Sequence, residues 1–228
     1  MSIRESRGFT LVEVLVALVI MAVMAGMAWQ GIDGIVRARD ASQARLETAL
    51  RLNTVIAQWD QDLASVQVTG VVSPSLNCAG NAVRMTRRTP TGIQLVVWTL
   101  RPAEDNTSTW ERWASPAVTT QGELTDTFLR SQQLQGGETG SIKTITGVSD
   151  WKVYFYQGNS WANCASSLGG AGGAGGAGGA GDAGGAAGAG GAGGGTPTLP
   201  DGVRMVLTFA PGSGLNGDLT RDTLLNNR

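Results

Sequence analysis

The stretch "RESRGFTLVEVLVALVIMAVMAGMAW" (Arg4–Trp29) decides how this chain is organised. Within it, the 21 residues Phe9–Trp29 carry Glu13 as their only charge. As a helix they would extend about 31 Å, which matches the hydrocarbon core of a bilayer. A secretion signal has a shorter apolar region, with its cleavage site after that region. Because Arg4 and Arg7 precede the run, we expect a retained single-pass helix whose N-terminus stays cytoplasmic while the rest of the chain is translocated.

Composition excludes several classes of function. The chain has 228 residues, 15% of them charged, and a formal charge of −1, so it lacks the basic surface that nucleic acid requires. It contains no histidine, which rules out Ser-His-Asp triads and imidazole zinc ligands. Two cysteines, Cys78 and Cys164, are too few for a thiolate metal site. In an oxidising compartment they can form a disulfide worth about 4–5 kcal/mol in the entropic model, or they can remain unpaired in loops that never meet.

A second helical pattern follows the apolar run and is assigned to residues 30–66. Its apolar stripe has steps of three and four residues, which favours packing on the protein's own sheet over a free coiled coil. The stripe consists of Ala49, Leu52, Ile56, Trp59 and Leu63, and the opposite, polar face is assigned Gln58, Asp60, Gln61 and Asp62. Three glycines, Gly26, Gly31 and Gly34, predict either a bend where the two helical segments join or local unwinding there when subunits pack.

The remainder, residues 67–228, is predicted to be rich in β-structure. β-Branched and aromatic residues alternate with polar ones in several short runs, and the tryptophans are expected to form the core. The predicted strands are Ile93–Leu100, Trp110–Ala114, Trp151–Gln157 and Val203–Phe209. The fold class is therefore α+β, a long N-terminal helix packed on an antiparallel sheet.

One segment, Gly169–Gly195, consists of Gly-Gly-Ala units with Asp182 as its only charge. It has no apolar side chain larger than alanine, so nothing in it offsets the entropy of ordering it. We expect a flexible insert at the tip of a hairpin, where a longer loop costs little extra free energy.

The segment "GFTLVEVLVAL" (Gly8–Leu18) resembles the cleavage and methylation signature of the type IV pilin superfamily. The resemblance implies a pilin-like fold and a leader, residues 1–8, that prepilin peptidase removes by cutting after Gly8. The peptidase then methylates the new N-terminal residue, Phe9. Glu13 becomes the fifth mature residue, and its carboxylate would neutralise the terminal amine of a neighbouring subunit during assembly.

Later segments are similar to the J-type minor pseudopilins of the type II secretion system. The matching positions are Val148, Trp151, Val153 and Phe155 (in place of tyrosine), then Trp161, and finally Leu199, Pro200, Gly202 and Val203. This resemblance implies a structural subunit of the pseudopilus tip, in the bacterial inner membrane with its C-terminal domain in the periplasm. Its partners would be the I- and K-type minor pseudopilins and the major pseudopilin. It implies no catalytic residues, no cofactor and no metal, and the glycine insert and the two cysteines depart from the family's pattern.

Two other functions remain open from the sequence. A minor pilin of a type IV pilus, acting in adhesion, twitching or DNA uptake, would share the same N-terminus. A single-span periplasmic binding module or metal-dependent enzyme would need a cluster of ligands. Its candidates are Asp201, Asp218 and Asp222, although acidic residues beside asparagine and glycine are common in turns.

Overall fold

The computed structural model describes residues 9–72, 75–103, 106–167 and 199–225. The predicted leader with Gly8 and the predicted insert Gly169–Gly195 lie outside the described residues. The chain divides into two compact units, Met1–Ala49 and Leu50–Arg228, and each is described by itself.

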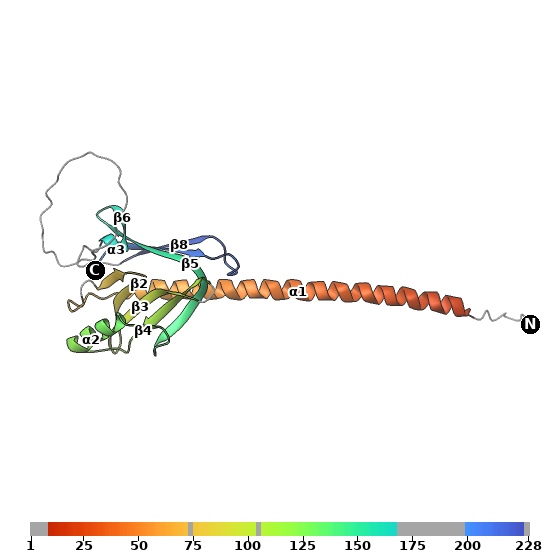
Figure 1. Cartoon of the computed structure of the whole chain (residues 1–228), viewed down its shortest axis with the longest axis horizontal. Coiled ribbons are helices and arrows are strands. Elements are labelled where there is room, and N and C mark those ends of the chain that lie inside the picture. The colour runs from red at the N-terminus through yellow and green to blue at the C-terminus, as the bar shows by residue number, and fades with distance from the viewer. Residues whose placement is uncertain (1–8, 73–74, 104–105, 168–198, 226–228) are drawn as a thin grey trace, which may run out of the picture. The chain divides into compact units, whose positions relative to one another are not determined.

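In the first unit the described chain from Leu11 onward is part of one helix, α1 (Leu11–Ala64, Figure 1). The helix is continuous through Gly26, Gly31 and Gly34, and local unwinding of this zone when subunits pack stays a prediction. Each glycine costs about 1 kcal/mol relative to alanine, which weakens a long helix without breaking it.

The second unit contains a sheet of eight strands in the order β1-β2-β3-β4-β5-β7-β8, with β6 paired to β5. All of its ladders are antiparallel. The strands are β1 (Leu76–Ala79), β2 (Ala82–Thr89), β3 (Gly92–Pro102), β4 (Ser108–Ala114), β5 (Ser141–Gln157), β6 (Ser160–Asn163), β7 (Gly202–Phe209) and β8 (Asp218–Leu224). Two further helices are α2 (Gln121–Ser131) and α3 (Cys164–Ser167). The predicted α+β class is confirmed, and β3, β4, β5 and β7 confirm the four predicted strands.

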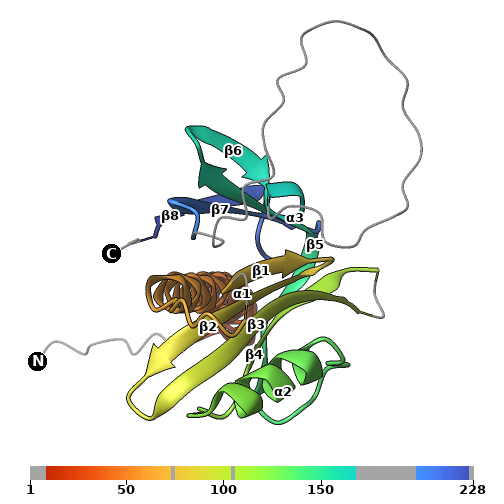
Figure 2. The ribbon, with the colours of Figure 1, turned by 90° about the vertical axis from the view of Figure 1, so that its left-hand side faces the viewer.

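Strand β5 joins two layers of this sheet. Its first half pairs with β4, and its second half, from Val148 to Tyr156, pairs with β7. The register shifts between Val148 and Asp150, and Gly147 just before has a φ of +73°, a conformation that glycine adopts without a Cβ penalty. In Figure 2 the C-terminal part of α1 lies between the layer β1–β4 and the layer that contains β7 and β8.

The predicted hairpin on either side of the insert is wrong. Strand β6 pairs with β5 rather than with β7, so β5 lies between them. The turn from β5 to β6 contains Gly158 and Asn159, both with positive φ, as a type I′ hairpin turn requires. This tight turn makes β5 and β6 the hairpin.

The core of the second unit is built around Trp59 of α1. Its ring lies 5.6 Å from Trp98 of β3, 5.7 Å from Trp110 of β4 and 6.1 Å from Trp151 of β5, measured between centroids. Trp59, Trp98 and Trp110 are fully buried. The aromatic side chains of both layers therefore meet on one turn of α1, which confirms the expected core role for Trp98, Trp110 and Trp151 but not for Trp161, which is exposed.

The predicted face of α1 needs two corrections. Ala49 is exposed, whereas Val55, which the predicted stripe omitted, is buried. Asp62, assigned from the sequence to the polar face, is fully buried. Leu52, Trp59 and Leu63 pack into the core as expected.

Candidate functional site

The N-terminal end of α1 carries the residues predicted to act in assembly. Phe9 precedes the helix and is 83% exposed, and Glu13 lies exposed in the first turn. The amide of Glu13 is 3.4 Å from Thr10 Oγ1, so Thr10 and Glu13 occupy the first and last positions of a Thr-x-x-Glu capping pattern. A carboxylate at this end also complements the helix dipole. Glu13 therefore has a local role that the sequence prediction did not consider.

The rest of the first unit presents an apolar surface. All described residues from 9 to 47 are exposed. By length and composition, α1 is the one helix among the described residues able to cross a membrane. Large apolar side chains exposed on it include Leu15, Val19, Ile20, Val23, Met27, Trp29, Ile32 and Ile35. A surface of this size is stable in contact with lipid or with other apolar helices, and unstable in water.

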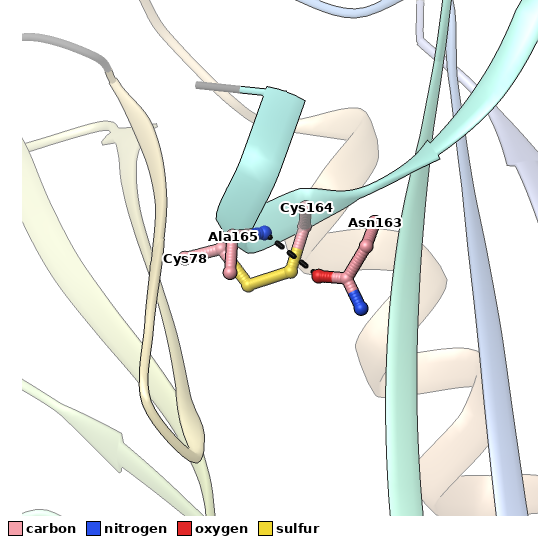
Figure 3. Close-up of a disulfide and its surroundings, with 4 residues drawn as sticks. All are labelled: Cys78, Asn163, Cys164 and Ala165. Carbon is pink, nitrogen blue, oxygen red and sulfur yellow. Dashed lines mark hydrogen bonds between the residues drawn. A yellow bond between two sulfur atoms is a disulfide. The ribbon is translucent and has the colours of Figure 1, made fainter. Parts of the chain in front are cut away.

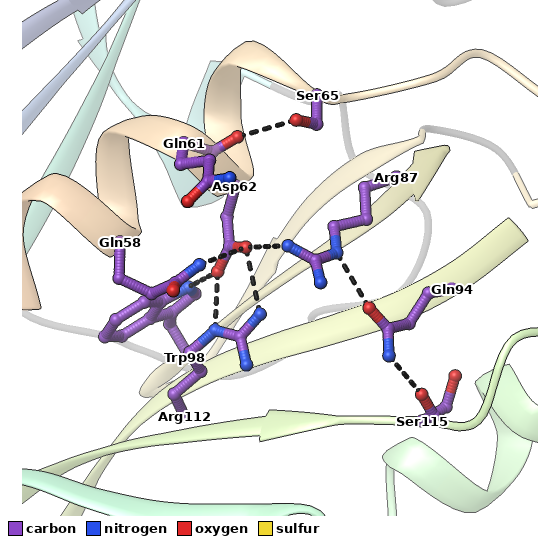
Figure 4. A network of polar contacts seen from close by, with 9 residues as sticks. All are labelled: Gln58, Gln61, Asp62, Ser65, Arg87, Gln94, Trp98, Arg112 and Ser115. Carbon is purple, nitrogen blue, oxygen red and sulfur yellow. Dashed lines mark hydrogen bonds and ion pairs between the residues drawn. The ribbon is translucent and has the colours of Figure 1, made fainter. Parts of the chain in front are cut away.

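At the other end of α1, a buried carboxylate attaches the helix to the first layer of the sheet (Figure 4). Asp62 accepts two hydrogen bonds from Arg112 of β4, at 2.7 and 2.9 Å, and one from Arg87 of β2 at 2.7 Å. The indole of Trp98 donates a further bond of 3.0 Å, and Gln58, one turn earlier, donates another of 3.0 Å. Five donors thus satisfy a side chain that has no exposed surface.

This attachment depends on the sheet. A carboxylate in the last turn of a helix is disfavoured by the helix dipole, and that turn of α1 has no basic residue to offset it. Burial of the charge adds a desolvation penalty of several kcal/mol. Arg112, whose side chain is 10% exposed, and Arg87, which is 20% exposed, compensate from β4 and β2. The end of α1 is therefore stable only while it is docked on these strands.

The neighbouring carboxylate, Asp60, binds the second layer. It accepts from Arg221 of β8 at 2.7 Å and from the hydroxyl of Thr223 at 2.7 Å. The Asp60 side chain is 23% exposed and that of Arg221 is 50% exposed, so water screens this pair far more than the pair at Asp62. Two carboxylates in the same turn, Asp60 and Asp62, thus connect α1 to both layers.

The two cysteines join the layers covalently (Figure 3). Cys78 in β1 and Cys164, the first residue of α3, form a disulfide with a Cα–Cα distance of 5.7 Å. Asn163 Oδ1 accepts from the amide of Ala165 at 3.0 Å and so fixes the start of α3. Both cysteines pack against the core that contains Trp59.

The candidate metal ligands do not come together. Asp222 forms two hydrogen bonds of 2.7 Å with Arg204, and these bonds hold the pKa of its carboxyl below its ordinary value. Asp218 lies four residues away in the same strand, a separation of about 13 Å. Within the part of the chain that the structure describes, no group of three His, Cys, Asp or Glu residues could hold a metal ion.

Trp161 and Gly202 match the later motifs, and the structure brings them together. A Cβ built on Gly202 would lie 3.7 Å from Trp161 Cη2, so the indole covers the glycine. The guanidinium of Arg204 stacks 4.4 Å from the same ring, and the ring of Tyr156 lies 5.1 Å from it. Two motif residues, Trp161 and Gly202, thus form one packed surface on β5, β6 and β7 with Arg204 and Tyr156.

The network at Asp62 was missed by sequence reasoning, although a signal was present. Positions 52, 55, 59 and 62 follow one another at helical spacing, so Asp62 lies on the same stripe as Trp59. A charged residue on a buried stripe requires partners of opposite charge. The arginines of the later strands were the candidates.

Comparison with known proteins gives one family match. Residues 3–29 match the model of the prokaryotic N-terminal methylation motif, so the chain carries this motif. Together with the long apolar helix and the antiparallel sheet, the motif makes the protein pilin-like. No curated protein matches the chain significantly.

Among solved structures, the chain is similar to one chain of the GspK-GspI-GspJ complex from the type 2 secretion system of enterotoxigenic Escherichia coli. The two are 15% identical, and the match covers 79% of this chain and 99% of the other, with a TM-score of 0.44.

Proposed function

We propose that this protein is a minor pseudopilin of the type II secretion system, a structural subunit of the pseudopilus tip without enzymatic activity. The observation that carries the proposal is the methylation motif at residues 3–29, with Glu13 as the only charge in the apolar span Phe9–Trp29 that it includes. The similarity of the later sequence motifs to J-type pseudopilins supports the type II assignment over a type IV pilus.

The proposed mechanism begins with cleavage between Gly8 and Phe9, which creates a cationic amine in apolar surroundings. Methylation of Phe9 leaves that charge in place. Glu13 of a neighbouring subunit would neutralise it and so fix the axial register between the two helices. The apolar helix can leave the inner membrane for the filament because lipid and neighbouring helices are similarly apolar. The domain that follows would then lie in the periplasm, where it meets the I- and K-type subunits and supports export of folded proteins.

Co-purification of the full chain with the I- and K-type pseudopilins of the same bacterium tests this proposal. Glu13→Ala should lose most of both partners, since it removes the countercharge. Membrane insertion should be retained because the substitution removes a charge from the apolar span. The same pull-down with the minor pilins of a type IV pilus tests the alternative. Recovery of those pilins without the I- and K-type subunits would contradict the type II assignment.

Two further variants separate the charge of Glu13 from its position in the capping pattern. Glu13→Gln keeps a residue that suits the last capping position but cannot neutralise an amine. Thr10→Ala removes the capping hydroxyl and keeps the charge. We expect Glu13→Gln to lose nearly as much of the I- and K-type partners as Glu13→Ala, while Thr10→Ala still binds both. Glu47→Gln, which changes another exposed carboxylate on α1, serves as the matched control and should behave as wild type.

A further inference from the structure

The disulfide links two distant parts of the sheet. Strand β1 is the edge strand at one end of the sheet, and β6 pairs with the C-terminal end of β5. The ladders β1–β2, β2–β3, β3–β4, β4–β5 and β5–β6 form one hydrogen-bonded path. Cys164 follows β6 directly, and its bond to Cys78 in β1 closes this path into a ring.

Along the sheet the two layers are joined through β5, and side chains of both layers also pack in one core around Trp59. The register shift between Val148 and Asp150 and the positive φ of Gly147 place an irregular segment at that junction. Bulged segments bend a strand and interrupt its ladder, so the junction is a suitable place for the layers to open. The polar links from α1 to the second layer, Asp60 with Arg221 and Thr223, are partly exposed and therefore weak.

We propose that the Cys78–Cys164 disulfide is a clasp that holds the two layers closed on α1. With the clasp formed, Trp59 and Leu63 of α1 stay enclosed by side chains from both layers. With the clasp reduced, the layers open about the irregular part of β5, and α1 remains attached to the first layer through Asp62. Firm attachment of α1 to the second layer thus becomes conditional on the redox state.

The redox step is an exchange with a disulfide oxidant. The thiols of Cys78 and Cys164 together give up two electrons and two protons, and the oxidant's disulfide takes them up to become a dithiol. An oxidising compartment such as the periplasm favours the closed form, and a reducing cytosol favours the open one. The clasp concerns the domain itself, so it does not rest on the proposed function.

Hydrogen exchange of the full chain in detergent micelles, measured by mass spectrometry without denaturant, tests the clasp. The oxidised protein is compared with the protein reduced by a phosphine and with the variant Cys78→Ser/Cys164→Ser. Amides of β1, β6, β7 and residues 52–60 of α1 should exchange at least about tenfold faster without the disulfide, because the layers open locally. Amides of the β3–β4 ladder should keep their protection. Treating the double variant with the same phosphine is the control and should change nothing.

Two results would overturn the clasp. Unchanged native exchange with only a lower thermal midpoint would mean that the disulfide acts on the unfolded chain alone. Uniform loss of protection in both layers would mean that the domain unfolds as a unit, with no opening at β5. A third form of the protein separates these cases further. When the two thiols of the reduced wild-type protein are joined through a flexible bis-maleimide linker, the chain constraint is kept but the short spacing between the cysteines is lost. If the disulfide acts as a clasp, amide exchange in this form stays fast.

Discussion

Substitution of Asp62 tests how α1 is attached to the β-domain. Asp62→Ala leaves Arg112, at 10% exposure, and Arg87, at 20%, without their countercharge. Removing one partner of a buried ion pair costs about 3–5 kcal/mol. Relief of the unfavourable helix dipole returns about 0.3–1 kcal/mol, and the lost indole bond of Trp98 costs about 1 kcal/mol more. The expected loss of stability is therefore about 3–5 kcal/mol, or a fall of about 6–20 °C in the thermal midpoint.

Asp60→Asn is the matched control, since it changes a carboxylate on the same helix. Its pair with Arg221 is partly exposed and should be worth less than about 1 kcal/mol. Denaturant unfolding of the full chain in detergent, followed by the fluorescence of the buried tryptophans, measures both variants. Equal losses for Asp62→Ala and Asp60→Asn would refute the claim that burial makes the Asp62 network the stronger attachment.

A compensated variant separates charge from packing. Asp62→Leu combined with Arg87→Met and Arg112→Met removes all three charges and keeps apolar volume. Replacing a buried ionic cluster in this way is often neutral or stabilising, so most of the lost stability should return. A triple variant no more stable than Asp62→Ala would show that the loss of stability does not come from the uncompensated arginines.

Two other predictions concern the second unit. Hydrogen bonds from Arg204 lower the pKa of Asp222, so the wild-type advantage in thermal midpoint over Asp222→Asn should be present above the ordinary pKa near 3.8 and disappear as the pH falls below it. An advantage that grew on acidification would contradict this pair. Gly140 has a φ of +92°, and an added Cβ would clash with the carbonyl oxygen of Ala114, so Gly140→Ala should cost about 1–3 kcal/mol. Gly137→Ala, also at positive φ but in open space, is the control for the clash and should cost less in the same denaturant titration.

The elements with a clear apolar period were predictable from the sequence. Residues Ile93–Leu100 and Val203–Phe209 have β-branched or alternating apolar residues, and both are strands in the structure. Strands β2 and β8 were missed because their sequences, AVRMTRRT and DLTRDTL, are rich in charge. Their charged residues are used in pairs with α1 or with a neighbouring strand, as Arg87 with Asp62 and Arg204 with Asp222 show. Pairing of this kind depends on tertiary contacts that a single segment does not reveal.

The candidate site was predictable to a similar extent. The positions of Phe9 and Glu13 follow from a contiguous motif, which can be read without a fold. The hairpin of β5 and β6 was also predictable, since Gly158-Asn159 is a turn signal. The prediction instead placed the hairpin turn at the glycine-rich insert and so paired the wrong segments. Helix α2 begins with a capping box between Thr120 and Glu123, which was overlooked because the helix is short and polar.

We propose that this chain is processed and keeps its apolar helix as a pilin-like subunit. Intact-mass measurement of the protein extracted from the membrane of a host with prepilin peptidase tests it most directly. We expect loss of the eight residues "MSIRESRG" and a gain of one methyl group on Phe9. A mature chain that begins near Ala28 or later, without methylation, would mean that an ordinary signal peptidase had removed the apolar helix, and it would contradict the proposed pilin-like processing.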